Sequence, residues 1–148
     1  MGNSSAYESD FYAWTMEQAR LLRARPMSAD VENIAEEIES MGRSEKRELI
    51  NRLAVLLTHL LKWQFQPNLR GTSWRLTIQE QRRKIARHLE DSPSLRASLD
   101  DVITKAYGDA LLGAQKETGL PESAFPVACP YSSEQIAAAD FLPEEERN

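Results

Sequence analysis

The chain has a single cysteine, Cys129, among its 148 residues, so an internal disulfide is excluded. Structural disulfides belong to oxidising compartments, and a chain without them fits a reducing one, so we expect a cytoplasmic protein. Cys129 is flanked by Ala128 and Pro130, with no basic residue close in sequence to lower the pKa of its thiol. We therefore expect an inert thiol and not a nucleophile.

Long hydrophobic runs are absent as well. Residues 1–10 contain neither a basic segment nor an apolar run, so they do not predict a secretory signal. The most apolar stretch of the chain is interrupted by Asn51, Arg52, His59 and Lys62. Because a membrane span needs about 20 predominantly apolar residues, we expect no membrane segment.

Metal ligands are scarce, because the chain has only two histidines, His59 and His88. A di-metal helical bundle places a Glu three residues before a ligating His, but Leu56 and Ile85 occupy those positions here. One cysteine and two distant histidines provide no zinc motif either. The sequence therefore predicts no metal site and no cofactor, and its carboxylates are interpreted as a solvated face.

What the chain does contain is helical periodicity, which is strongest over residues 44–66. Apolar side chains there cover roughly half of the helix circumference, wider than the stripe of a one-sided surface helix. We therefore expect this segment to be the central helix of the fold. Its apolar positions are Leu49, Leu53, Leu56, Leu57, Leu60, Leu61 and Trp63.

Capping residues, glycines and prolines divide the rest of the chain into further helices. Gly42 favours a break before the central helix, because a glycine often closes a helix in the left-handed conformation. The other predicted helices cover residues 10–23, 30–41, 74–90, 93–119 and 133–139, with a turn at 25–27. Ser9 or Asp10 is expected to cap the first helix, Ser28 the second, and Ser132, with Gln135 three residues on, the last, while Gly119 ends the fifth. The buried stripes are expected to be Val31, Ile34, Ala35, Ile38 and Met41 in the second helix and Trp74, Ile78, Ile85 and Leu89 in the fourth.

No alternating run is long enough to predict a strand, so the expected fold class is all-α. We expect one domain over residues 1–148, a compact bundle of about five main helices, which is typical of a chain of this length. Residues 1–8 are expected to be frayed. Residues 120–148 form an irregular tail that carries the short helix and is expected to wrap the bundle.

Gln64 falls in the middle of the apolar arc of the central helix. A buried amide without hydrogen-bond partners costs about 1–3 kcal/mol. Gln64 therefore either bonds the polar end of a tryptophan or a backbone group of the tail, or the arc is open there to a ligand. We favour an internal partner.

The net charge is −5, but the charged residues are unevenly distributed along the sequence. Acidic residues dominate the second predicted helix and basic residues dominate the fourth. Helical geometry places Arg75 and Arg82 at the edge of the apolar stripe. From there they can turn inward to form structural ion pairs with carboxylates such as Glu37 or Glu39. The outward-facing bases Arg83, Lys84 and Arg87 are the predicted binding surface.

Several segments resemble a bacterial family filed as domain of unknown function 29. The resemblance begins with residues 36–49 (EEIESMGRSEKREL) and covers nearly the whole chain. It implies a compact helical fold and a bacterial, intracellular protein, and it carries no catalytic residues to this chain. The other similar segments are residues 60–64 with Pro67, 73–78 with 81–83, 90–95, 118–121 and 129–131.

Three hypotheses of function remain open. The first is a non-enzymatic interaction module, an adaptor or regulator that binds a protein partner. This hypothesis leaves a homo-oligomer possible. The second is nucleic-acid binding by the basic helix at 74–90, which the acidic net charge disfavours. The third is an enzyme whose site assembles from His59, Gln64 and the carboxylates of the second helix. We expect the first, and hence no enzymatic activity.

Overall fold

The computed structural model describes residues 7–24 and 29–144, which form helices and short turns and contain no strand. The all-α prediction is therefore confirmed. The predicted turn at 25–27 and the Ser28 cap lie outside the described residues. So do residues 1–6 of the terminus expected to fray, whereas residues 7–9 form a helical turn.

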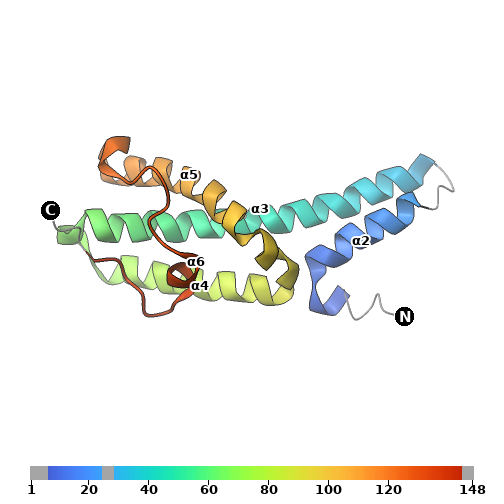
Figure 1. Cartoon of the computed structure of the whole chain (residues 1–148), viewed down its shortest axis with the longest axis horizontal. Coiled ribbons are helices and arrows are strands. Elements are labelled where there is room, and N and C mark those ends of the chain that lie inside the picture. Colours follow the sequence, from blue (N-terminus) through green and yellow to red (C-terminus); the bar gives the residue numbers. More distant parts are fainter. Residues whose placement is uncertain (1–6, 25–28, 145–148) are drawn as a thin grey trace. The chain divides into compact units, whose positions relative to one another are not determined.

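The elements follow one another along the chain as Figure 1 shows. The α-helices are α2 (Phe11–Arg23), α3 (Ala29–Phe65), α4 (Thr72–Asp91), α5 (Leu99–Thr118) and α6 (Ser133–Ala137), and the 3-10 turns are η1 (Pro67–Leu69), η2 (Pro93–Ser98) and η3 (Glu122–Ala124). None of these helices has the length and apolar character to cross a bilayer.

Contacts divide the chain into two compact units. Unit 1 comprises Met1–Leu49 and Arg87–Ser98, and unit 2 comprises Ile50–Ala86 and Leu99–Asn148. Helices α3 and α4 each contribute residues to both units.

In unit 1, α2 lies alongside the first half of α3 (Figure 1). Asp10 begins α2 as its N-cap, accepting a hydrogen bond from Ala13 N at 3.0 Å. It also holds the turn η2, because its carboxylate accepts bonds from Ser94 N at 2.6 Å and Ser94 Oγ at 2.9 Å. Ser92 Oγ adds a third contact by accepting from Tyr12 N at 3.1 Å. The start of α2 is thus fixed by polar groups that lie 80 and 84 residues away in the sequence.

The predicted break at Gly42 is wrong, because α3 continues through it as one helix of 37 residues. Gly42 is buried, and a methyl group at its α-carbon would collide with Thr15 Oγ1 of α2. Thr15 itself is fully buried. The glycine is therefore required for the close approach of two helices, and the left-handed conformation that closes a helix plays no part here.

The predicted stripe of the second helix is only partly buried. Ala35 is fully buried, whereas Ile34 is 49% exposed and Met41 is 48% exposed. Within unit 1, α2 covers the side of α3 that carries Ala35 and Gly42. Ile34 and Met41 are therefore left as apolar side chains on an uncovered side.

The core of unit 2 forms around the second half of α3, as the sequence predicts. The central leucines are at most 1% exposed, and Trp63 is half-buried. Lys62 is buried beside them, with its Nζ 4.5 Å from the centroid of the Trp74 ring and 3.6 Å from Glu117 Oε2. The lysine charge is thus balanced by a π-face and a carboxylate from two other helices. The central leucines of unit 2 are Leu53, Leu56, Leu57, Leu60 and Leu61.

The fifth helix begins later than predicted, since residues 93–98 form the 3-10 turn η2 and the α-helix starts at Leu99. The turn is held in unit 1 through Ser92 and Ser94, which explains why the α-helix does not extend back to Pro93. Gly119 follows the helix with φ of 75°, the left-handed conformation expected of a closing glycine.

Side chains of the tail fasten it to the helices of unit 2. Tyr107 donates its hydroxyl proton to Pro126 O at 2.6 Å, and the Phe125 ring meets Phe65 edge to face with centroids 5.5 Å apart. Helix α6 carries the predicted capping box of Ser132 and Gln135, although it ends at Ala137 instead of residue 139.

Candidate functional site

Arg82 is the predicted site residue that is most deeply buried, at 8% exposed. Its Nε donates to Ile136 O at 2.9 Å and its Nη2 donates to Gln135 O at 3.2 Å. These carbonyls belong to the last turn of α6, where backbone acceptors lack helical partners and a cation is favoured by the helix dipole. Burial lowers the pKa of Arg82, and the charge of Asp140 opposes this shift. The side chain is turned inward, and the groups it bonds are tail carbonyls where we expected a carboxylate.

The other bases of α4 lie at the surface. Arg75 is exposed, which does not match the inward orientation expected from the sequence. Arg83 and Arg87 are exposed as predicted, and Lys84 is paired with Glu80 at 3.0 Å one turn away.

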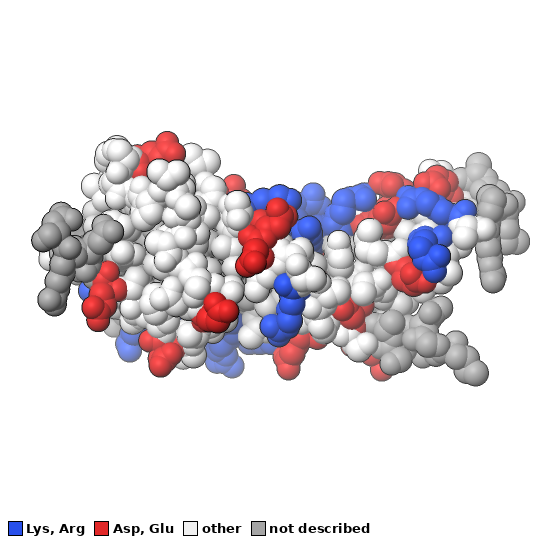
Figure 2. Space-filling model, in the orientation of Figure 1, with Lys and Arg blue, Asp and Glu red and all other residues white. Residues whose placement is uncertain are grey.

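Three carboxylates of α3 in unit 1, those of Glu32, Glu36 and Glu39, pair with arginines close by. Glu39 forms an ion pair with Arg23 of α2, which also contacts Glu32 at 2.8 Å. Glu36 lies 2.8 Å from Arg43 on its own helix. Glu37, the other predicted structural carboxylate, is exposed. Figure 2 shows the result, with acidic and basic side chains interleaved over α2 and the first half of α3.

The residues proposed for an assembled enzyme site each have a local partner. His59 Nδ1 lies 2.8 Å from Val55 O one turn earlier in α3. Gln64 accepts a hydrogen bond from the Tyr131 hydroxyl at 2.7 Å, so its internal partner is a tail side chain. These contacts disfavour a catalytic role for His59 and Gln64. Burial raises the pKa of the Cys129 thiol, which keeps it protonated and a poor nucleophile, in line with the inert thiol expected from the sequence.

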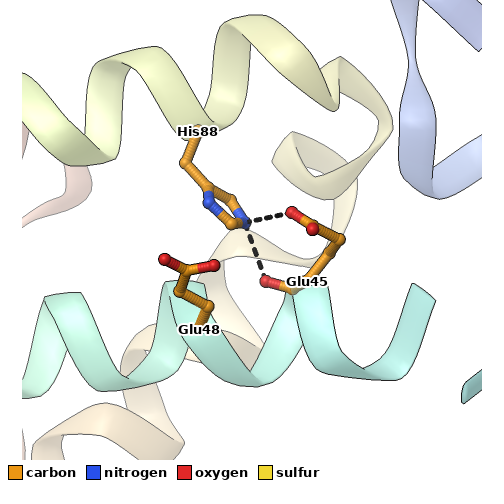
Figure 3. Close-up of side chains that lie close together, drawn as sticks. All are labelled: Glu45, Glu48 and His88. Carbon is orange, nitrogen blue, oxygen red and sulfur yellow. Dashed lines mark hydrogen bonds and ion pairs between the residues drawn. The ribbon is translucent and has the colours of Figure 1, made fainter. Parts of the chain in front are cut away.

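A cluster that sequence spacing does not reveal lies in unit 1 and comprises Glu45, Glu48 and His88 (Figure 3). The two glutamates are three residues apart on α3 and so share one helix face. His88 comes from the last turns of α4 and is 8% exposed. One potential ligand atom from each of the three side chains lies within 4.8 Å of the others.

The hydrogen bonds of the cluster define the imidazole orientation. His88 Nε2 lies 2.7 Å from the backbone oxygen of Glu45 and 3.5 Å from the carboxylate oxygen Oε2 of the same residue. A carbonyl oxygen only accepts hydrogen bonds, so Nε2 must carry a proton and donate it. The Glu48 carboxylate is turned towards the same ring (Figure 3). The cluster therefore joins α4 to α3 through a buried donor surrounded by anionic groups.

The sequence does not reveal this cluster, because the ligand pattern expected of a helical metal site has glutamate and histidine on the same helix. Here the glutamates are on α3 and the histidine is about 40 residues later, on α4. The available signal was the Glu-x-x-Glu pair at 45 and 48, which had been interpreted as part of a solvated face. Only the packing of the two helices within unit 1 brings His88 to it.

Comparison with known protein families identifies a family whose model covers most of the chain. The model of a family described as Domain of unknown function DUF29 matches residues 6–142. The chain belongs to this family. The resemblance inferred from residues 36–49 is thereby confirmed.

Among solved structures, an alpha-helical protein of unknown function from Rhodospirillum rubrum is similar to this DUF29 chain. The TM-score is 0.68 at 26% sequence identity, and the alignment covers 91% of this chain and 90% of that one. This likeness supports the helical fold over nearly the whole length. No curated protein matches the chain.

Proposed function

We propose that this DUF29 protein is a non-enzymatic interaction module that binds a protein partner on an uncovered apolar face of α3. The observation that carries the proposal is the exposure of two large apolar side chains in unit 1, Ile34 at 49% and Met41 at 48%. Together with the half-buried Ile38 they form what we call the α3 strip.

Helical geometry makes the α3 strip continuous. Its members are spaced at i, i+4 and i+7, which places them along one side of the helix over two turns. A contiguous exposed apolar patch is unusual on a protein that acts alone and marks an interaction site more often than isolated apolar residues do. The spacing is also the pattern by which one amphipathic helix contacts another.

Charge next to the α3 strip indicates the chemistry of the partner. Glu37 is exposed beside Ile38 on the same helix, three residues after Ile34. The partner expected is therefore an amphipathic helix with an apolar face and at least one Lys or Arg at its border. Such a charged rim adds orientation and salt dependence more than affinity.

The remaining hypotheses have less support. Arg83 and Arg87, with Lys84, stay a predicted contact for an acidic partner, and a nucleic acid is the alternative occupant of these bases. The pairing of Lys84 with Glu80 and the net charge of −5 weaken the attraction that phosphates would need. An enzyme site built on His59 and Gln64 is disfavoured because both groups bond within their own unit.

Site-specific photocrosslinking in the cells that make the protein tests the proposal. Benzoylphenylalanine is placed at position 34 or, as a matched exposed apolar control, at position 112, where Leu112 is 67% exposed on α5 of unit 2. We expect a discrete adduct from position 34 with a basic, amphipathic helical segment of another protein. Equal adducts from both positions would contradict the proposal, and a crosslink to the same chain would replace the partner with a second copy.

A further inference from the structure

We propose that Glu45, Glu48 and His88 form a binding site for one divalent transition-metal ion of the zinc class. The proposal does not depend on the function proposed above, because it concerns a different set of side chains. It also revises the expectation from the sequence that the chain has no metal site, which rested on ligand spacing within single helices.

The donor set has the right chemistry for such an ion. Zinc is bound in proteins by imidazole nitrogens and carboxylate oxygens, and three protein ligands with a water molecule complete a tetrahedral site. An imidazole ligand favours zinc and related ions over Mg²⁺ and Ca²⁺, which prefer an all-oxygen environment. Two glutamates and one histidine therefore suit a zinc-class ion, with charge −2 from the carboxylates to balance it.

The distances are close to those that the metal would impose. Ligand atoms bound at about 2.0–2.2 Å to a tetrahedral ion lie about 3.3–3.6 Å from one another. His88 Nε2 and Glu45 Oε2 are already 3.5 Å apart. All three donor atoms lie within 4.8 Å of one another, so a turn of the His88 ring off the Glu45 carbonyl and a side-chain adjustment of Glu48 would complete the set.

Binding exchanges a proton for the metal at one nitrogen. In the metal-free protein Nε2–H donates to the backbone oxygen of Glu45 at 2.7 Å. For the metal to bind, the Nε2 proton leaves to solvent while Nδ1 takes up a proton from solvent, so the imidazole stays neutral and Nε2 presents a lone pair. The hydrogen bond to the carbonyl is then replaced by the metal–nitrogen bond. The Glu45 carbonyl lies within α3 and keeps its place in the helix hydrogen-bond ladder.

The histidine of the cluster is buried, whereas one of its glutamates reaches the solvent. The His88 side chain is 8% exposed, so packing limits its ring to the small turn that moves Nε2 off the Glu45 carbonyl and towards the carboxylates. The Glu45 side chain is 32% exposed and connects the cluster to solvent, from which an ion and its water ligand can enter. A site of this kind joins α3 to α4 within unit 1, so occupancy should stabilise that unit by mass action.

Calorimetric titration of the full chain with Zn²⁺ at pH 7 tests the proposal, with Mg²⁺ as the comparison ion. We expect saturable binding of one Zn²⁺ per chain and no saturable binding of Mg²⁺. Loss of an outer-shell partner lowers metal affinity about 10–100-fold, so removal of a direct ligand in Glu48→Gln should weaken binding at least about tenfold. His88→Gln should abolish the saturable phase.

Three variants serve as matched controls. Glu37→Gln removes a carboxylate of α3 outside the cluster, His59→Gln removes the other histidine, and Cys129→Ser removes the thiol. Each should leave the Zn²⁺ affinity unchanged. Glu48→Gln provides the decisive comparison if His88→Gln fails to fold.

Nuclear magnetic resonance of ¹⁵N-labelled histidine gives a second, independent reading. His88 Nε2 should show a protonated-nitrogen signal without metal and shift to a metal-bound signal with one equivalent of Zn²⁺, while His59 stays unchanged. Absence of saturable binding up to about 1 mM Zn²⁺, or affinity unchanged in Glu48→Gln, would overturn the proposal and leave the cluster as a hydrogen-bonded link between two helices.

Discussion

Replacement of Gly42 by alanine should destabilise the protein although alanine is the better helix former. Gly→Ala in the interior of a helix ordinarily stabilises by about 0.5–1 kcal/mol. At Gly42 the added methyl group would meet the fully buried Thr15, whose Oγ1 is held by donation to Tyr12 O at 2.7 Å. Overpacking of this kind costs about 1–3 kcal/mol. The difference between the two is a net loss of about 0–2.5 kcal/mol. Because Thr15 is fully buried and hydrogen-bonded, we expect a loss in the upper part of that range, about 1–2 kcal/mol in the free energy of unfolding.

A second glycine in the same chain provides the control. Gly108 lies within α5, and a methyl group there would have nothing within 4 Å. Gly108→Ala should therefore raise the free energy of unfolding by about 0.5–1 kcal/mol, opposite in sign to Gly42→Ala. Urea unfolding measures both, and the loss at Gly42 corresponds to a fall in melting temperature of roughly 2–8 °C.

Changes at Thr15 identify the cause. In a Thr15→Ala background, where Oγ1 is gone, Gly42→Ala should become neutral or stabilising, with a coupling of at least about 1 kcal/mol. In a Thr15→Ser background Oγ1 remains and the penalty should persist. If Gly42→Ala is as stabilising as Gly108→Ala, the close approach of α2 and α3 at this position is wrong.

Two further predictions concern unit 2. Arg82→Ala should lower the free energy of unfolding by at least about 1.5–3 kcal/mol, the range for a hydrogen bond from a charged group, and should release α6 to proteolysis. Arg83→Ala, a change at the exposed neighbouring residue, should neither lower the free energy of unfolding nor expose α6 to proteolysis. Equal effects of the two changes would contradict a structural role specific to Arg82. Burial raises the pKa of Tyr107 to about 12 and also raises that of Tyr131, with smaller contributions from Cys129. The folded protein then keeps tyrosine protons that the unfolded chain loses above about pH 10, so the contribution of these two tyrosines to stability should be constant below pH 10 and fall as the pH rises towards 12. Urea unfolding across this range should show a shallower fall for Tyr107→Phe and Tyr131→Phe, and an unchanged slope would refute the shifts.

Much of the fold could be predicted from the sequence because the signals were local. The leucines of residues 44–66 repeat with helical period, and their burial follows from the width of the apolar arc. Asp10, Ser132 and Gly119 act as the predicted helix ends, since capping depends on residues within one turn. These features need no knowledge of distant segments.

The errors and omissions concern positions whose surroundings are set by a distant segment. Gly42 is an effective helix terminator in isolation, and only Thr15 on another helix gives it a packing role. Arg82 was expected to meet a carboxylate, yet the free carbonyls at the end of α6 are its partners. His88 comes from α4 and approaches Glu45 across the interface with α3. Helical phase predicts which way a side chain points, but not which element it meets.

The α3 strip shows the same limit of sequence patterns, here for side chains that are predicted to be buried and are exposed in the structure. Ile34 and Met41 are predicted to be buried because they are apolar residues that recur with helical spacing. The pattern cannot tell whether the covering surface belongs to the same chain or to another. Their exposure is the reason for proposing a partner, and that proposal is the central claim about function.

Titration of the partner segment identified by crosslinking at position 34, made as a synthetic peptide, tests this claim most directly. The double variant Ile34→Glu with Met41→Glu should fold normally, because both side chains are about half exposed in unit 1. It should bind the peptide at least about tenfold more weakly than wild type, since binding would bury two unpaired charges. Leu112→Glu should bind as wild type does. Equal affinity for the double variant and wild type would contradict the account.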